Sequence, residues 1–232
     1  MTTVTHRDTD LWTRCQDAAR HRGLAPALRL LASSLTPGLL PCGPGGHTLA
    51  DAGTFAEAGG LWIAGTTRPR RPADEAVLSR TALPGGEVVA ATVTTAPPTA
   101  RRGAAEREAG AAFVLGLAWV RLGLSESLRS ACLGYLGRRR SGDSYLLQQQ
   151  LVKGTVAEAV ADHLEVRAVL SGAGPGDLPA AVLADVHARI TAADREQVRL
   201  LGASGYLRDG PGMPCYLSEL LAEVHVTGEE PR

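Results

Sequence analysis

LLGASGYLRDGPGMPCYLSELLAEVHV, the stretch Leu200–Val226, joins a glycine-rich turn to a short apolar helix. Gly202 and Gly205 interrupt the helical pattern that precedes them, because glycine weakens a helix interior. After these glycines, apolar residues return at helical spacing. The stretch therefore predicts that one helix ends near residue 201 and that a last helix spans Pro214–Val226.

Three longer helices are predicted before this stretch. They cover about 104–140, with a break near Gly123, about 145–171, and about 180–201, because apolar residues recur at helical spacing in each. Four helices joined by short loops favour an antiparallel up-down bundle. The side of the second helix that faces the core is expected to consist of Leu147, Leu151, Val156, Val160, Leu164 and Val169.

The first hundred residues have a different character. Two helices are predicted within Asp8–Leu35, divided by Gly23 and Pro26. Thr36–Gly46 is so rich in Pro and Gly that we expect a linker without regular structure. Three strands are expected in LWIAGT, AVLSRTAL and EVVAATVTT. The chain should thus contain an N-terminal helical segment (1–35), a linker with a small, reduced β region (36–103) and a helical bundle (104–232).

Composition narrows the function classes. The chain carries 24 basic and 24 acidic residues, so no net charge favours nucleic acid or an anionic membrane. The apolar run Ala109–Val120 is shorter than the roughly 20 residues of a membrane span, and the N-terminus does not resemble a signal peptide. The four cysteines form no paired or metal-ligand motif, which predicts packing thiols, no metal site and a cytoplasmic protein.

Two stretches resemble the C-terminal helical domain of the acyl-CoA dehydrogenase family. The segment from Gly123 through Tyr135 and Arg139 to Gln150 is similar to that family's helix, turn and helix of the form GLA…Y…ER(K)xFG…Q. Leu200–Val226 is similar to its LLGGxGY…P…RD…IYEG ending. The resemblance covers about 104–226 and implies a mostly α fold, an up-down bundle that assembles into dimers or tetramers.

The resemblance also implies a flavoprotein lineage. Family members hold FAD between a helical domain, a β domain and a neighbouring subunit. Arg139, Gln150, Gly202 and Gly205 match the arginine, glutamine and two turn glycines that approach FAD across the subunit interface. Arginine can pair with a pyrophosphate, and glycine lets backbone N–H groups come close to it. Departures from the family pattern occur at Gly142, Asp143, Ala203, Leu217 and Ser218.

The catalytic glutamate is the missing element. In the resemblance, its usual position falls on Val226, beside His225, and the alternative position on the first long helix falls on Phe113. Neither valine nor phenylalanine accepts a proton. A shift of register towards Glu229 or Glu230 would supply a carboxylate. The strand around Trp62, GLWIAG, is similar to the family's flavin-holding KxWITN strand, although a generic Trp-bearing strand is the alternative.

Three functions are compatible with these patterns. The first is a truncated, base-less subunit that pairs with a full-length acyl-CoA or acyl-carrier dehydrogenase and shares its FAD. The second is a repurposed enzyme without flavin that performs an acid–base step, with His225, Tyr206 and Asp209 as candidate catalytic residues. The third is a non-catalytic structural protein. Autonomous dehydrogenation is the least favoured, since it needs a base and a full β domain.

Overall fold

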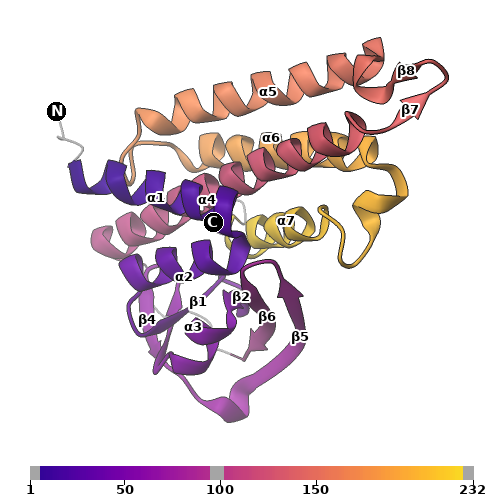
Figure 1. The fold of residues 1–232 in the computed structure, drawn as a ribbon. Helices are drawn as coiled ribbons and strands as arrows, with labels where there is room; N and C mark the ends of the chain where they lie inside the picture. Colours follow the sequence, from indigo (N-terminus) through magenta and orange to yellow (C-terminus); the bar gives the residue numbers. More distant parts are fainter. Residues whose placement is uncertain (1–5, 95–101, 227–232) are drawn as a thin grey trace.

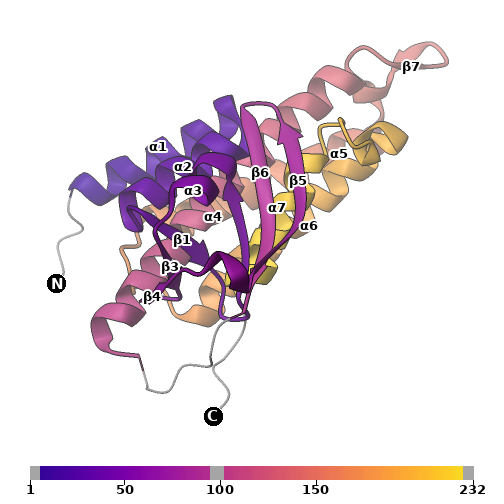
Figure 2. The ribbon, with the colours of Figure 1, turned by 90° about the horizontal axis from the view of Figure 1, so that it is seen from below.

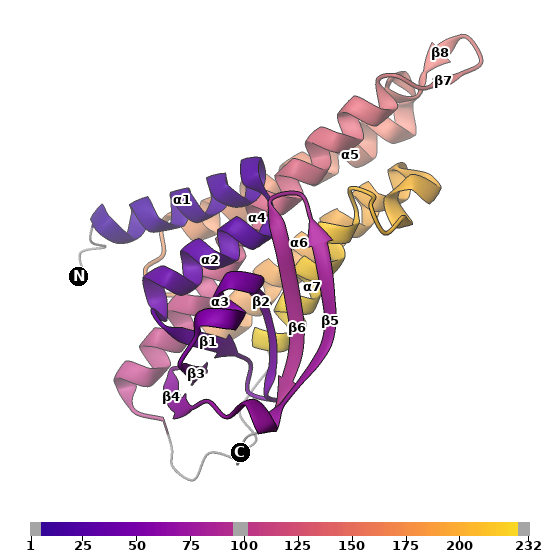
Figure 3. The ribbon, with the colours of Figure 1, turned by 60° about the horizontal axis from the view of Figure 1, so that its bottom comes forward.

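The computed structural model describes residues 6–94 and 102–226. Long helices form one layer, and a β region with two short helices covers one side of it (Figure 1). Turned views show the strands β5 (Glu75–Leu83) and β6 (Gly86–Val93) running alongside the helices α2 (Leu24–Leu35) and α7 (Met213–His225) (Figures 2 and 3). One apolar core unites residues from the N-terminal helices, the strands and the bundle. The prediction of a mostly α chain with a small β region is confirmed.

The N-terminal segment forms two helices, as predicted. They are α1 (His6–Arg22) and α2 (Leu24–Leu35), and Gly23 lies between them with φ 95°. Glycine is favoured there because other residues rarely adopt a positive φ. Helix α1 packs along α4, where Gln16 Nε2 donates to Glu126 Oε2 at 3.0 Å. The N-terminal helices are therefore part of the same packed body as the bundle.

The β region contains two three-stranded sheets, ordered β1-β3-β4 and β2-β6-β5. The three predicted strands are present as β3 (Gly60–Ile63), β5 (Glu75–Leu83) and β6 (Gly86–Val93). The sequence did not reveal β2 (His47–Asp51), α3 (Ala52–Glu57), β4 (Thr66–Pro69) or the turn η1 (Pro72–Asp74).

The expectation of a structureless linker at 36–46 was wrong, because β1 (Leu39–Cys42) lies inside it and pairs in parallel with β3. This strand tolerates Pro41 because it lies at the edge of its sheet, where a missing N–H costs little. Three of its four residues are buried. Burial against neighbouring elements therefore outweighed the local preference of a Pro- and Gly-rich segment.

The first long helix is α4 (Ala104–Leu136), 33 residues without the break expected near Gly123. A Cβ at Gly123 would lie 2.3 Å from the backbone oxygen of Gln16, so this glycine permits the close approach of α1. It is the one helix in the described part of the chain that is long and apolar enough to cross a membrane, but 83% of its apolar window is buried inside the protein. Its composition is that of a core helix.

A hairpin of β7 (Arg140–Ser141) and β8 (Ser144–Tyr145) and the turn η2 (Leu146–Gln148) lead from α4 into α5 (Gln150–Ser171). The predicted buried side of α5 was largely wrong, since Leu151, Leu164 and Val169 are exposed. The buried residues are Ala159, His163, Val166 and Leu170. His163 is buried because Ser125 and Arg129 of α4 pair with its ring, at 2.7 and 2.5 Å.

The remaining helices match their predicted positions. Helix α6 (Ala180–Leu200) is followed by the turn η3 (Gly202–Tyr206) and by α7 (Met213–His225). Helices α4 to α7 run up and down beside one another (Figure 1). A second small core at the end that holds η3 joins α4, α6 and α7 through Leu128, Cys132, Leu136, Leu201 and Cys215.

Candidate functional site

The residues expected to face a cofactor gather at one end of the bundle. Arg139 follows α4, Gln150 begins α5, and Gly202 and Gly205 lie in η3 after α6, all at the end marked by β7 and β8 (Figure 1). Arg139 and Gln150 are exposed. The guanidinium of Arg139 lies 4.9 Å from the ring centre of Tyr135 and donates to its hydroxyl. This end therefore offers a cation, an amide and a tight turn to solvent.

Glycine stands at the two positions of the turn η3, Gly202 and Gly205, for different physical reasons. Gly202 is exposed, has φ 57°, and would place a Cβ in open space. Gly205 is buried, and a Cβ there would lie 2.7 Å from the backbone oxygen of Val198. Close packing of η3 on α6 is enough to explain Gly205. Only the turn at Gly202 leaves its backbone open to a ligand.

A second cluster lies where the β region meets the bundle. Trp62 of β3 and Phe113 of α4 have ring centres 4.8 Å apart, and Phe113 and His225 of α7 have ring centres 5.1 Å apart. These are ordinary distances for tilted aromatic pairs. The structure thus brings together Trp62, Phe113 and His225. In the resemblance, Phe113 stands at the alternative position of the catalytic base, and His225 stands next to the usual position, Val226. Three segments distant in sequence therefore meet at this cluster.

No protein-family model matches the sequence, and no curated protein matches it. Solved structures do. A variant of the Tcur3481-Tcur3483 steroid ACAD matches with a TM-score of 0.62 at 14% identity, over 93% of this chain and 76% of that one. The acyl-CoA dehydrogenase of Slackia heliotrinireducens matches with a TM-score of 0.59 at 12% identity, over 90% of this chain and 74% of that one. The chain has the acyl-CoA dehydrogenase fold.

A glutaryl-CoA dehydrogenase from Mycobacterium smegmatis in complex with FADH2 matches less completely. Its TM-score is 0.51 at 16% identity, and the match covers 79% of this chain and 56% of that one. The chain thus spans about three quarters of the first two relatives and just over half of the third. These likenesses establish the fold, and the activity of this acyl-CoA dehydrogenase-like chain has to be argued from its own residues.

The aromatic cluster is closed to a flavin ring or an acyl chain. The cavity beside Phe113 and His225 has a volume of about 10 Å³, close to the space of a single water. The turn after β1 also presses on the end of α7, because a Cβ at Gly43 would lie 1.9 Å from the backbone oxygen of Val224. The aromatic cluster therefore has no room for FAD, whereas Arg139, Gln150 and Gly202 are exposed at the end of the bundle.

The candidate acid–base residues do not form one site. His225 lies at the end of α7, next to Val226. Tyr206 and Asp209 are exposed and precede α7 at its other end, which is roughly 18 Å away for a 13-residue helix. Desolvation by its surroundings lowers the pKa of His225 to about 4, so its ring is neutral at pH 7. A neutral imidazole can accept a proton, but the cavity beside it leaves no room for a substrate.

Asp51 is a polar residue of this region that the sequence analysis missed. Its Oδ1 accepts hydrogen bonds from the N–H groups of Gly53 and Thr54, both at 3.1 Å, and caps α3. Its Oδ2 is buried without a hydrogen-bond partner in the described part of the chain, and Asp51 lines the same cavity as His225. The pattern DAGT, an acidic residue before small residues, was the available signal for this cap.

The bundle also buries a polar cluster that hydropathy gave no reason to expect. Arg121 of α4 is completely buried, and its guanidinium donates to Ser218 at 2.9 Å, Thr191 at 2.6 Å and the backbone oxygen of His187 at 3.0 Å. Burial lowers the pKa of His187 to about 3. Through its hydrogen bonds to Ser218, Thr191 and His187, Arg121 links α4 to α6 and α7. A single arginine inside an apolar run was the only sequence signal.

Asp194 of α6 belongs to the same interior. Burial raises the pKa of its carboxyl to about 7, although the nearby hydroxyl of Ser125 acts to lower it. Neither carboxyl oxygen has a partner with full hydrogen-bond geometry among the described residues. The amide oxygen of Gln197, one turn further along α6, is also without a donor there. A protonated Asp194 would be an O–H donor one helical turn from this acceptor. The described residues contain no group of three or more potential metal ligands, so this interior is polar without a metal site.

Proposed function

We propose that this chain is a base-less subunit that pairs through its bundle with a full-length flavin-dependent acyl-CoA or acyl-carrier dehydrogenase and completes the partner's FAD site. One contrast carries the proposal. Arg139, Gln150 and Gly202, which match cofactor-facing residues in the resemblance, are exposed at one end of the bundle, whereas Trp62, Phe113 and His225 pack against one another and leave a cavity of only about 10 Å³. A subunit that serves a partner's cofactor needs the first feature and can lose the second.

Each residue at the bundle end has a chemical role in this proposal. The guanidinium of Arg139 would pair with the pyrophosphate, and the amide of Gln150 would supply a polar contact. Gly202 would let backbone N–H groups approach, and Gly205 would hold the turn against α6. A FAD held mainly by the partner would supply the acceptor for a hydride from the acyl chain. The catalytic base would also belong to the partner.

The same end carries the apolar surface that a subunit contact needs. Exposed apolar side chains near it are Leu133, Tyr145, Leu151, Tyr206, Leu207 and Tyr216. Exposed aromatic and leucine side chains around a polar centre are typical of protein–protein interfaces. The two-component name of the Tcur3481-Tcur3483 relative is compatible with pairing. A cytoplasmic location also belongs to the proposal, since all four cysteines are buried and free.

Co-expression tests the proposal. The chain is produced with a tagged full-length acyl-CoA dehydrogenase from the same genome, and the complex is examined by gel filtration and by its visible flavin absorbance. We expect a yellow complex. Arg139→Ala should lower the flavin content about tenfold or more, because a charge-assisted contact to the pyrophosphate is lost. The neighbouring exposed residue Arg138 provides the matched control Arg138→Ala, which should keep the flavin.

The opposing outcomes are equally clear. A colourless homo-oligomer that ignores every full-length partner would favour the structural protein. Equal flavin loss in Arg138→Ala and Arg139→Ala would show that general charge, and not the matched arginine, holds the cofactor. The stand-alone enzyme lacks a comparable observation in its favour, because the cavity beside His225 is only about 10 Å³.

A further inference from the structure

A second surface feature, far from both clusters, lies between α1 and α2. It is an open groove of about 680 Å³, within the usual range for small-molecule sites. Ala18, Pro26 and Leu30 form its apolar part, and Arg14, Arg22 and Arg29 line it. The neutral net charge of the chain makes three arginines around one groove a local excess of positive charge.

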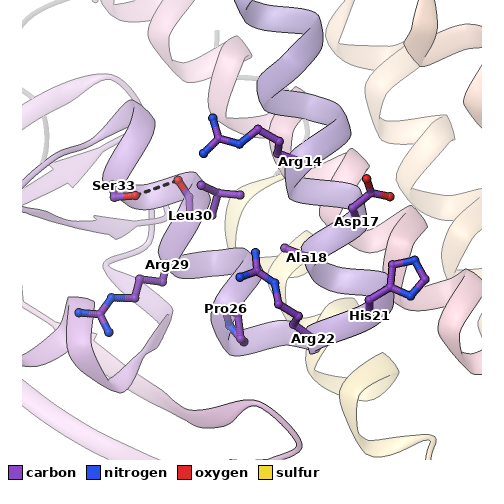
Figure 4. Close-up of a pocket in the computed structure, with 9 residues that line it drawn as sticks. All are labelled: Arg14, Asp17, Ala18, His21, Arg22, Pro26, Arg29, Leu30 and Ser33. Carbon is purple, nitrogen blue, oxygen red and sulfur yellow. Dashed lines mark hydrogen bonds between the residues drawn. The ribbon is translucent and has the colours of Figure 1, made fainter.

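The orientation of the side chains separates the basic residues from the one acidic residue. Arg14 and Arg22 extend from α1 towards α2, in the direction of Leu30, whereas Asp17, which also lines the groove, lies on the part of α1 farther from α2 (Figure 4). The carboxylate of Asp17 thus points away from the two guanidinium groups.

These arginines are not held by strong pairs. Among the described residues, the side chain of Arg14 pairs with Asp10 at 3.8 Å and that of Arg29 with Glu57 at 3.4 Å, and both pairs are exposed. Exposed pairs of this kind contribute about 1 kcal/mol or less, so a ligand can displace them. The side chain of Arg22 has no hydrogen bond or ion pair with any described residue. Arg70, in contrast, binds Glu75 through two contacts of 2.6 and 2.9 Å.

The backbone at one end of the groove is closely packed. The turn between β5 and β6 packs on the corner between α1 and α2, because a Cβ at Gly85 would lie 2.0 Å from the backbone oxygen of Arg22. Arg14 and Arg22 are eight residues apart on one helix, which places their Cα atoms roughly 12 Å apart along its axis.

We propose that this groove binds a small molecule with two separated phosphate groups, such as a nucleoside bisphosphate, with one phosphate on Arg14, the other on Arg22 and the apolar part on Ala18 and Leu30. Arginine favours phosphate because its N–H groups can bind two oxygens at once. The separation of the two arginines favours two phosphates over one. The groove does not depend on the proposed subunit role, since it lies on the N-terminal helices and not at the bundle end.

Isothermal titration of the full chain with adenosine bisphosphate, adenosine monophosphate and inorganic diphosphate tests this site. We expect the bisphosphate to bind, and the monophosphate to bind about tenfold more weakly because one charged contact is missing. Arg14→Ala and Arg22→Ala should each weaken bisphosphate binding about tenfold, and Arg22→Lys less, since lysine keeps the charge but not the two-oxygen geometry. Inorganic diphosphate should bind no better than the monophosphate.

The control is Arg208→Ala, an exposed arginine in the loop before α7. It should leave bisphosphate binding unchanged, and thermal unfolding would verify that every variant is folded. The proposal is overturned if the bisphosphate does not bind, if Arg208→Ala weakens binding as much as Arg22→Ala, or if diphosphate binds as well as the bisphosphate. None of these outcomes bears on the flavin complex, which is tested with Arg139→Ala.

Discussion

The ring of His225, at the end of α7, packs against the ring of Phe113 of α4 with a centroid distance of 5.1 Å. Trp62 of β3 also packs against Phe113, with a centroid distance of 4.8 Å. The three rings form an aromatic contact between the β region and the bundle. Stability, and not turnover, is the property that these residues should control.

Removal of Phe113 tests this interpretation. Phe113 is buried, with 3% of its surface exposed, and Phe113→Ala would leave a cavity between Trp62 and His225. Chemical denaturation should show a loss of about 3–5 kcal/mol in the free energy of unfolding. Leu133→Ala, on the exposed side of the same helix, should cost about 0.5 kcal/mol or less. Similar losses in both variants would contradict a packed aromatic core at this position.

Acid should destabilise the fold through its buried histidines. The pKa values of His163 and His225 are lowered to about 4 and that of His187 to about 3, mainly by burial. The unfolded chain binds protons on these rings below the ordinary pKa of about 6.5, whereas the folded chain does not. Stability is thus present above pH 6.5 and is lost as the pH falls towards 4. Thermal unfolding at a series of pH values would measure this loss, and an unchanged midpoint from pH 7 to 4 would contradict it.

The buried carboxyl of Asp194 has the opposite effect on the pH dependence of stability. Because the folded pKa of about 7 lies above the ordinary value of 3.8, the folded chain keeps a proton that the unfolded chain releases. This contribution falls as the pH rises from about 4 to 7. Asp194→Asn removes it and should raise the free energy of unfolding at pH 8 by about 1–3 kcal/mol. At pH 4 the substitution should raise the free energy of unfolding little. An equal gain at pH 4 and at pH 8 would show that titration of Asp194 is not the cause.

Two helical glycines should respond in opposite directions to the same change. Gly123→Ala would bring a methyl group within 2.3 Å of the backbone oxygen of Gln16 and push α1 away from α4. We expect a loss of about 1–3 kcal/mol. Gly154→Ala, on the exposed side of α5, meets nothing within 4 Å and should stabilise the chain by about 0.5–1 kcal/mol. Urea denaturation of the pair would measure both, and a gain in both variants would contradict close packing of α1.

Local patterns predicted the helices well but not the surfaces that they bury. The positions of α6 and α7 followed from apolar spacing and from Gly202 and Gly205. The buried side of α5 did not follow, because His163 is stabilised by Ser125 and Arg129, which are more than thirty residues away in the sequence. Hydropathy alone assigns a histidine to the surface when its partners are unknown.

The same limit applies to the candidate sites. The sequence identified Arg139, Gln150, Gly202 and Phe113 as positions of interest, because the resemblance fixes their register, and the absence of glutamate at Val226 is visible without a structure. The role of Asp51 and the cluster around Arg121 and Asp194 could not be found in this way. Their hydrogen bonds and burial depend on contacts between separate elements.

The sequence by itself determined the order of the helices and, through the resemblance, predicted which positions match cofactor residues and where a carboxylate is replaced by valine, since these depend on residue type and spacing along the chain. Only the tertiary structure decided that the seat beside Phe113 is closed, that Arg139 and Gly202 share one exposed end, and that α1 and α2 enclose a basic groove. Cavities and clusters arise where distant segments pack, and packing distances are not encoded in any local pattern.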